Sequence, residues 1–240
     1  TGVQTCALPI SGKTTAFIGS TGCGKSTLVN LIPRFYDVTD GKITIDGKDI
    51  RNVSQHELRE KLGYVPQKAV LFSGDIASNI LYGNPDGSEA EMTEAATIAQ
   101  ATEFIEQKKK KYKSTISQGG SNVSGGQKQR LSIARAIAKH PDVYIFDDSF
   151  SALDYKTDAT LRAKLKEKTS ESTVMIVAQR ISTILHADQI IVLDDGQIVG
   201  KGTHKELLKN CEAYYQIASS QLSENELEED LKEVELYAKR

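Results

Sequence analysis

The sequence predicts an α/β fold in which a mostly parallel sheet is flanked by helices and a helical subdomain is inserted between the strands. Two observations lead to this prediction. Short apolar runs rich in β-branched residues alternate with helical patterns near both ends of the chain, which is typical of a parallel sheet covered on both faces. Between about residues 73 and 139 the alternation stops, and the sequence becomes helical in pattern.

The individual elements follow from the hydrophobic periodicity. The first strand is predicted over Thr14–Gly19, because the run TTAFIG is apolar, β-branched and ends at glycine. Further strands are predicted over residues 42–46, 62–65, 143–146, 173–177, 189–193 and 197–200. Helices are predicted over residues 26–32, 89–107, 127–138 and 155–168, and again from residue 205.

The two ends of the chain are set apart from this domain. The opening run TGVQTCALPI is similar to the translation of a DNA-sequencing adapter, so we interpret residues 1–11 as a segment that is not native. The main domain is then predicted over residues 12–222. Residues 223–240 form an acidic amphipathic tail, predicted to be helical, in which Ser223 and Glu226 fit a capping box.

Composition narrows the functional class. Hydrophobic residues make up 39% of the chain and charged residues 26%, with a net charge of −2 and no basic stripe, so nucleic acid is not an expected partner. No apolar run is long enough to cross a bilayer. The three cysteines have neither disulfide nor zinc spacing, which favours a reducing compartment.

A glycine-rich loop follows the first strand. Its sequence, GSTGCGKS, matches the phosphate-binding loop pattern in full and lies after a strand and before a helix, as that pattern requires. Glycines let backbone N–H groups surround phosphate oxygens, Lys25 supplies a positive charge, and Ser26 supplies a hydroxyl for Mg²⁺. The predicted fold is therefore a P-loop NTPase core. The predicted ATP-binding residues are Gly19, Ser20, Thr21, Gly22, Cys23, Gly24, Lys25, Ser26 and Thr27.

A carboxylate ends a later apolar strand. In the run VYIFD, the strand predicted over residues 143–146 is followed directly by Asp147. Ligands collect at the carboxyl ends of strands in open parallel sheets, and a carboxylate there can hold Mg²⁺. An apolar strand that ends in Asp is common, but together with the loop it indicates a nucleotide site.

A second phosphate-binding element decides the family. The run NVSGGQ places Ser124, Gly125, Gly126 and Gln127 at the start of the helix predicted over residues 127–138, where N–H groups can bind phosphate. Two such elements in one domain make sense if each holds a different ATP. The chain resembles the ABC ATPases here, whose signature motif is LSGGQ; Val123 replaces the leucine.

The resemblance extends over residues 12–222, with the motifs in the family order. Gln67, in YVPQ, matches the Q-loop glutamine, which reaches Mg²⁺ and faces the membrane domain, so the implied metal ligands are Ser26, Gln67 and Asp147. The segments at residues 34–37, 71–80 and 178–183 are similar to the exporter branch of the family. The D-loop, which crosses the dimer interface in this family, corresponds to Ser151, Ala152, Leu153 and Asp154.

Two positions depart from the family pattern. The family usually has glutamate as the general base where this chain has Asp148, and a switch histidine where it has Gln179; with Gln67, these are the implied catalytic residues. Aspartate reaches about 1.5 Å less far than glutamate, and glutamine cannot carry a proton charge near neutral pH. Both changes spare phosphate binding, so the chain resembles the degenerate-site subunit of bacterial heterodimeric multidrug exporters.

The resemblance implies an ATPase with ATP and Mg²⁺ as cofactors. The implied partners are a second ABC ATPase subunit, in a heterodimer, and a transmembrane domain encoded upstream. The implied location is the cytoplasmic face of a bacterial plasma membrane. Three alternatives stay open: a symmetric homodimeric exporter, a soluble ABC ATPase of the chromosome or repair type, and a module that senses ATP without transport. The soluble class usually has long coiled coils between its nucleotide motifs, and no heptad run lies between Lys25 and Asp147.

Overall fold

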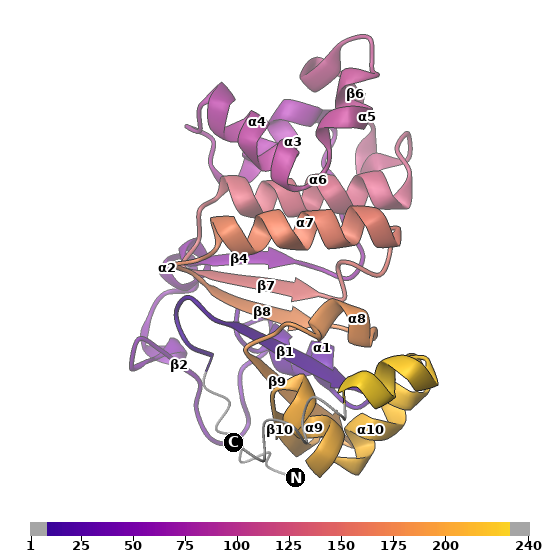
Figure 1. Ribbon diagram of the computed structural model, residues 1–240. Helices are drawn as coiled ribbons and strands as arrows, with labels where there is room; N and C mark the ends of the chain where they lie inside the picture. The colour runs from indigo at the N-terminus through magenta and orange to yellow at the C-terminus, as the bar shows by residue number, and fades with distance from the viewer. Residues whose placement is uncertain (1–8, 231–240) are drawn as a thin grey trace. The chain divides into compact units, whose positions relative to one another are not determined.

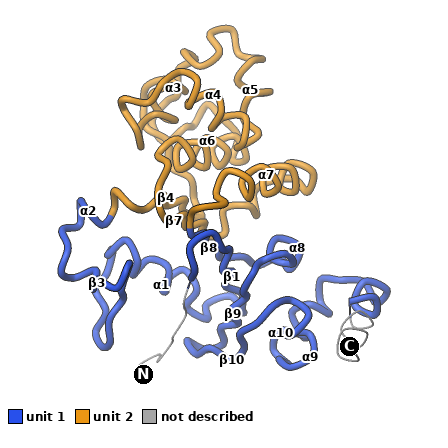
Figure 2. The backbone as a smooth tube through the Cα atoms, turned by 60° about the vertical axis from the view of Figure 1, so that its left-hand side comes forward, with its two compact units in different colours: residues 1–58, 173–240 blue, residues 59–172 orange. Residues whose placement is uncertain are grey.

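The structure is a computed structural model, and it describes residues 9–230. The chain forms two compact units, one from residues 1–58 and 173–240 and the other from residues 59–172 (Figure 2). The helical subdomain expected over about residues 73–139 lies inside the second unit. The predicted α/β class with mostly parallel strands and flanking helices is confirmed (Figure 1).

The first unit is built on four neighbouring strands in the order β10-β9-β1-β8. The strands β1 and β8 run parallel, as do β1 and β9, whereas β10 pairs antiparallel with β9. The centre of β1 is fully buried, because a parallel strand is covered on both faces. The bounds are β1 (Thr14–Gly19), β8 (Thr173–Val177), β9 (Gln189–Asp194) and β10 (Gln197–Gly202).

Helices of the first unit flank these strands. The helix α10 packs against β1, β9 and β10 (Figure 1). The helix predicted from residue 205 is in fact two helices, because the backbone of Cys211 between them is extended. The bounds are α1 (Lys25–Asn30), α2 (Gln55–Glu60, which continues into the second unit), α8 (Ile181–Ile184), α9 (His204–Asn210) and α10 (Glu212–Ser219). A small hairpin joins β2 (Thr44–Ile45) to β3 (Lys48–Asp49), followed by a 3₁₀ turn at Ile50–Asn52.

The second unit combines two parallel strands with a group of helices. The buried Ser149 hydroxyl donates to the Val65 carbonyl (2.9 Å) and ties the ends of these strands together. The helices α3 and α4 pack on α6 (Figure 1). The bounds are β4 (Leu62–Val65), β5 (Gly74–Asp75), α3 (Ile76–Ile80), α4 (Glu89–Ile98), α5 (Thr102–Glu106), β6 (Thr115–Ile116), α6 (Gly125–Ala138), β7 (Val143–Asp147) and α7 (Tyr155–Lys168). Single 3₁₀ turns lie at Leu81–Gly83, Lys111–Lys113 and Gln118–Gly120.

The continuous helix predicted over residues 89–107 is wrong. The first helix ends at Ile98, and Gln100 has a left-handed backbone with φ of 56°. The side chain of Gln100 donates to the Thr97 carbonyl. The backbone carbonyl of Gln100 accepts from the guanidinium of Arg130 (2.8 Å). The break is thus stabilised by a tertiary hydrogen bond as well as by a local cap.

The tail predicted over residues 223–240 is described only in part. Residues 224–230 are helical, and Ser223 and Glu226 exchange the hydrogen bonds of a capping box. Residues 231–240 and the first eight residues of the segment interpreted as non-native lie outside the described residues. Between residues 9 and 230, no helix combines the length and apolar character needed to cross a bilayer.

Candidate nucleotide site

The glycine-rich loop leaves β1 at a position that only glycine can occupy. Gly19 has φ of 156°, and a Cβ atom there would clash with the carbonyl oxygen of Leu193 on β9 and lie 2.8 Å from the Cys23 sulfur. Gly22 and Gly24 have φ of 86° and 99°, in the left-handed region that favours glycine. The pattern of glycines therefore follows from the backbone path of the loop.

Lys25 lies folded into this loop. Its ammonium group donates to the carbonyl oxygens of Gly19 and Ser20, each at 2.8 Å, and lies 3.5 Å from the Cys23 sulfur. The residue is only 7% exposed. A buried ammonium held by neutral carbonyls, with no carboxylate among its contacts in the described chain, is well placed to bind an anion.

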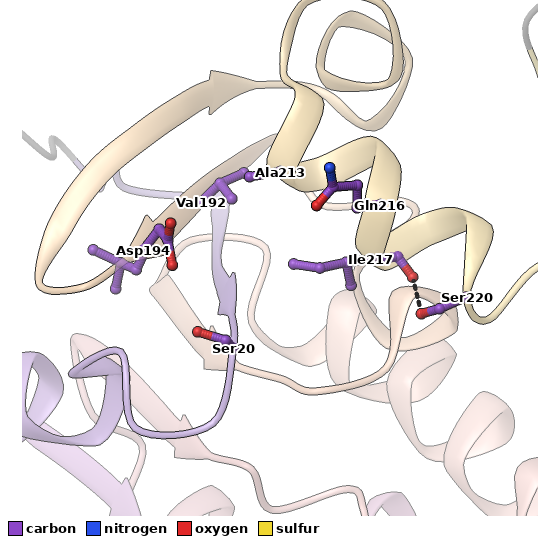
Figure 3. A pocket seen from close by; sticks show the side chains of 8 residues that line it. Ser20, Val192, Asp194, Ala213, Gln216, Ile217 and Ser220 are labelled. Atoms are coloured by element: carbon purple, nitrogen blue, oxygen red, sulfur yellow. Dashed lines mark hydrogen bonds between the residues drawn. The ribbon is translucent and has the colours of Figure 1, made fainter.

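The predicted loop residue Ser20 also borders a hollow on the same unit. The hollow has a volume of about 250 Å³ and lies between β9 and α10 (Figure 3). Asp194, Gln216 and Ser220 contribute polar side chains to its lining, and Ile217 an apolar one. Sequence reasoning gave no indication of this hollow, because α10 is far from the loop along the chain.

The candidate switch residue Gln179 lies two residues after the end of β8. The backbone N–H of Ala178 donates to the Phe17 carbonyl (3.0 Å), which continues the pairing of β8 with β1 for one residue. The carbonyl oxygen of Gln179 accepts a hydrogen bond from the side chain of Gln221 (2.8 Å). In the first unit, the switch segment is thus joined both to the strand that precedes the loop and to the end of α10.

Two adjacent carboxylates end β7 in the second unit. Asp147 is 4% exposed and Asp148 8% exposed. The Tyr64 hydroxyl lies 3.4 Å from Asp147, and burial, followed by the charge of Asp147, raises the pKa of Tyr64. Gln67 donates from its amide to Asp148 (3.1 Å). The Q-loop glutamine and the candidate base are therefore in direct contact.

Asp148 has an unusual backbone conformation. Its φ is 46°, in the left-handed region that few residues other than glycine adopt. Strained backbone of this kind is concentrated at functional sites. The Ser151 hydroxyl donates to the Asp148 carbonyl (2.9 Å), which connects this turn with the D-loop.

The predicted metal ligands are of types that suit Mg²⁺. In the second unit, Asp147 and Gln67 have a carboxylate and an amide oxygen; the third predicted ligand, Ser26, belongs to the first unit and has a hydroxyl. No cluster of three His, Cys, Asp or Glu residues exists within residues 9–230. Mg²⁺ commonly binds through one or two carboxylates together with substrate phosphates, so the buried carboxylate of Asp147 fits it.

The signature motif and the D-loop lie against each other in the second unit. Ser124 caps α6: its hydroxyl accepts from the Gln127 N–H (3.3 Å), and the Gln127 side chain accepts from the Ser124 N–H (3.1 Å). A Cβ atom on Gly126 would lie 3.3 Å from the carbonyl oxygen of Ala152, whereas one on Gly125 would meet nothing within 4 Å. The close approach explains one glycine, and the open space leaves the other accessible to a ligand.

The D-loop ends as the cap of α7. The carboxylate of Asp154 accepts from the Thr157 N–H (3.0 Å), and hydrogen bonds from Thr157, its side chain first, lower the pKa of Asp154. Leu153 is buried, whereas Ser151 and Ala152 are exposed. The D-loop thus has a fixed end and an exposed start.

Sequence reasoning missed three residues whose side chains contact predicted site residues or the segments that carry them. Gln129 is 2% exposed and donates to the Pro66 carbonyl (3.2 Å), which ties α6 to the Q-loop. Tyr64 is the first residue of the run YVPQ, in which only Gln67 was given a role, so its place in that run was an available signal. Gln221 had no local signal, because its partners lie about 40 residues earlier in the chain.

Comparisons with known proteins agree with this arrangement. Residues 10–151 match the family model described as ABC transporter. An uncharacterised ABC transporter ATP-binding protein of Mycobacterium tuberculosis is 49% identical over 213 residues, which cover 88% of this chain and 36% of the relative. A putative multidrug export ATP-binding/permease protein of Staphylococcus aureus is 45% identical over 210 residues, with the same coverage of each chain.

A solved structure gives the same result for the fold. The structure of a bacterial Atm1-family ABC exporter with ATP bound matches with a TM-score of 0.86 and 40% identity, covering 89% of this chain and 38% of that one. The chain therefore spans a little over a third of the length of the relatives it matches. The family expected from the sequence motifs is confirmed: this chain belongs to the ABC transporter family and carries its ATP-binding domain.

Proposed function

We propose that this chain is the ATP-binding and ATP-hydrolysing domain of an ABC exporter and powers export across a membrane as half of a dimer. The observation that carries the proposal is the buried Lys25 ammonium, which donates to two carbonyls of a loop whose path requires glycine at position 19. The relatives described as ATP-binding/permease proteins support the exporter assignment.

The residues have distinct parts in the proposed reaction. Lys25 and the loop N–H groups bind the β- and γ-phosphates and neutralise the charge that develops on them. Ser26, Gln67 and Asp147 would hold Mg²⁺, which supplies further positive charge against the phosphate oxygens. Asp148, held by Gln67, orients the attacking water, and Gln179 donates a hydrogen bond toward the γ-phosphate.

We further propose that this hydrolytic site turns over slowly. Asp148 lacks one methylene relative to the usual glutamate, and its carboxylate accepts a hydrogen bond from Gln67. A base outside hydrogen-bonding distance of its water costs roughly 10²–10⁴ in rate. The signature residues Ser124–Gln127 are intact, so the partner in a heterodimer would use them against its own ATP. A homodimer with symmetric hydrolysis is the competing arrangement.

An exposed apolar patch supports a membrane-domain partner. It consists of Val70, Phe72 and Tyr82, which are 54%, 43% and 61% exposed. Phe72 and Tyr82 stack at 4.4 Å between ring centroids, and the guanidinium of Arg135 lies 5.0 Å from the Phe72 ring. Exposed apolar groups gathered on one face mark protein interaction sites. Docking of a transmembrane domain there would place the chain at the cytoplasmic face of the membrane.

The proposed nucleotide site is tested by binding of ATP with Mg²⁺. Lys25→Ala removes the only side-chain charge of the loop, and we expect ATP affinity to fall at least about 100-fold, since charge-assisted contacts to phosphate are worth 1.5–3 kcal/mol each. Isothermal titration calorimetry of the purified chain measures this. Lys42→Ala, an exposed lysine elsewhere in the first unit, is the matched control and should bind as the unaltered chain does. Equal affinity for all three proteins would refute the site.

A further inference from the structure

Gln221 bridges the segment that joins β8 to α8. Its amide nitrogen donates to the carbonyl oxygen of Gln179 (2.8 Å), and its amide oxygen accepts from the N–H of Ile181 (2.9 Å). The two partners lie on either side of Arg180. One side chain therefore fixes the backbone both before and after this residue.

The two bonds determine how the Gln221 amide is oriented. A carbonyl can only accept and an N–H can only donate, so turning the amide by 180° would break both contacts. The Ile181 N–H is the first of α8, and Arg180, the N-cap of that helix, provides no side-chain cap. Gln221 thus caps a helix of four residues from a distant part of the chain.

The helical segments before and after Gln221 both contact one histidine, His204 on α9. On the preceding helix α10, the hydroxyl of the fully buried Tyr214 lies 2.7 Å from Nδ1 of His204. In the helical segment that follows, Asp230 lies 3.0 Å from Nε2 of His204, and Leu227 is 8% exposed. The residues before and after Gln221 therefore both dock on α9.

The same end of α10 also lies beside the phosphate-binding loop. Ser220, which precedes Gln221, lines the hollow that Ser20 borders (Figure 3). Within the first unit, the end of α10 thus faces the loop that would hold the triphosphate and the segment that would sense it.

We propose that Gln221 is a positioning residue for the γ-phosphate-sensing segment. By fixing the Gln179 carbonyl and the Ile181 N–H, it sets the direction in which the Gln179 side chain leaves the backbone. It also joins that segment to the C-terminal helices, so a change in their docking alters how the site distinguishes ATP from ADP. The inference rests on the proposed function of Gln179, and the test below separates the two.

The first measurement tests the hydrogen bond between the Ile181 N–H and the Gln221 side chain. In Gln221→Ala, we expect the Ile181 amide to exchange with solvent deuterium about tenfold faster, since a hydrogen bond worth about 1.4 kcal/mol corresponds to that factor. Gln55→Ala is the matched control, because Gln55 is an exposed glutamine of the same unit, on α2, and does not line the hollow that Ser20 borders. Unchanged exchange in Gln221→Ala would overturn the proposal.

The second measurement tests the positioning role. The ratio of affinities for a non-hydrolysable ATP analogue and for ADP, both with Mg²⁺, reports sensing of the γ-phosphate without requiring turnover. We expect this ratio to fall about tenfold in Gln221→Ala, with little change in ADP affinity, and to stay unchanged in Gln55→Ala. If Gln221 had a structural role alone, its loss would lower the affinities for the ATP analogue and for ADP equally, and that result would overturn the proposal.

Two further variants distinguish a failure of the proposed sensing function of Gln179 from a failure of the positioning role of Gln221. Gln221→Glu keeps the acceptor for Ile181 but removes the donor to Gln179, so we expect normal Ile181 exchange with a reduced affinity ratio. Gln179→Ala should reduce the ratio at least as much as Gln221→Ala. If Gln179→Ala has no effect, the proposed sensing function is wrong; if only Gln179→Ala has an effect, sensing stands and the positioning role of Gln221 is refuted.

Discussion

Single residues account for the chemistry proposed at the nucleotide site. Gly19 is required because β9 leaves no space for a side chain, and the ammonium of Lys25 lies among the loop carbonyls where a phosphate would bind. Asp148 has a left-handed backbone and a hydrogen bond from Gln67. The residues predicted to bind phosphate thus match the motif of the family, whereas the residues proposed to act on water depart from it.

This difference leads to a prediction for two positions. Asp148→Glu combined with Gln179→His should raise ATP turnover by about 10²-fold or more, since a well-placed base is worth roughly 10²–10⁴ in rate. ATP affinity should change little, because neither residue belongs to the loop. Phosphate release measured at saturating ATP gives the rate. If the unaltered chain hydrolyses as fast as the double variant, the slow-site proposal is wrong.

The phosphate-binding loop was easier to predict than the surroundings of the candidate base. The glycine positions and Lys25 follow from the requirements of binding phosphate, so their spacing alone was sufficient for the prediction. The positive φ of Asp148 and its contact with Gln67 depend on how β4 and β7 pair, which brings residues 81 apart in the chain together. A local pattern holds no information about such a contact.

At the scale of elements, tertiary hydrogen bonds decide where helices end. The predicted bounds of β1, β4, β8 and α7 agree with the structure, because apolar runs and capping residues mark them locally. The end of α4 could not be predicted, because Gln100 takes the place usually held by glycine and its carbonyl is bound by Arg130.

Asn79 provides a second tertiary anchor. Its buried side chain exchanges hydrogen bonds with both backbone groups of Phe72, at 2.9 Å each, and accepts from Arg135 (2.9 Å). The Arg135 guanidinium also donates to the Asn79 and Val70 carbonyls, and burial lowers the pKa of Arg135. Asn79 therefore fixes the backbone that presents the aromatic patch.

Removing this side chain should be costly. In Asn79→Ala, several partly buried hydrogen bonds around the fully buried Asn79 are lost, and we expect the free energy of unfolding to fall by about 2–4 kcal/mol. Asn52→Ala, at an exposed asparagine, is the control and should change it by less than about 0.5 kcal/mol. Urea denaturation followed by circular dichroism measures both. A loss below about 1 kcal/mol in Asn79→Ala would show that Asn79 is not an anchor.

At the scale of the whole molecule, the proposed function requires association with a second ATP-binding subunit. The chain spans little more than a third of its relatives, and its signature motif and glycine-rich loop are two separate elements that we propose bind phosphate. The sequence could predict that both bind phosphate, from residue type and position at a helix start. It could not predict that Gln221 joins the C-terminal helices to the switch segment, because those contacts arise only from packing.

The most direct test is to locate ATP in the closed complex, trapped with a non-hydrolysable analogue and Mg²⁺ and solved at a resolution that shows side chains. We expect Lys25 to contact one triphosphate while Ser124 and the N–H groups at the start of α6 contact another, held by the loop of the partner subunit. If Lys25 and Ser124 of one subunit meet the same ATP, or Ser124 meets none, the proposed dimer mechanism is contradicted.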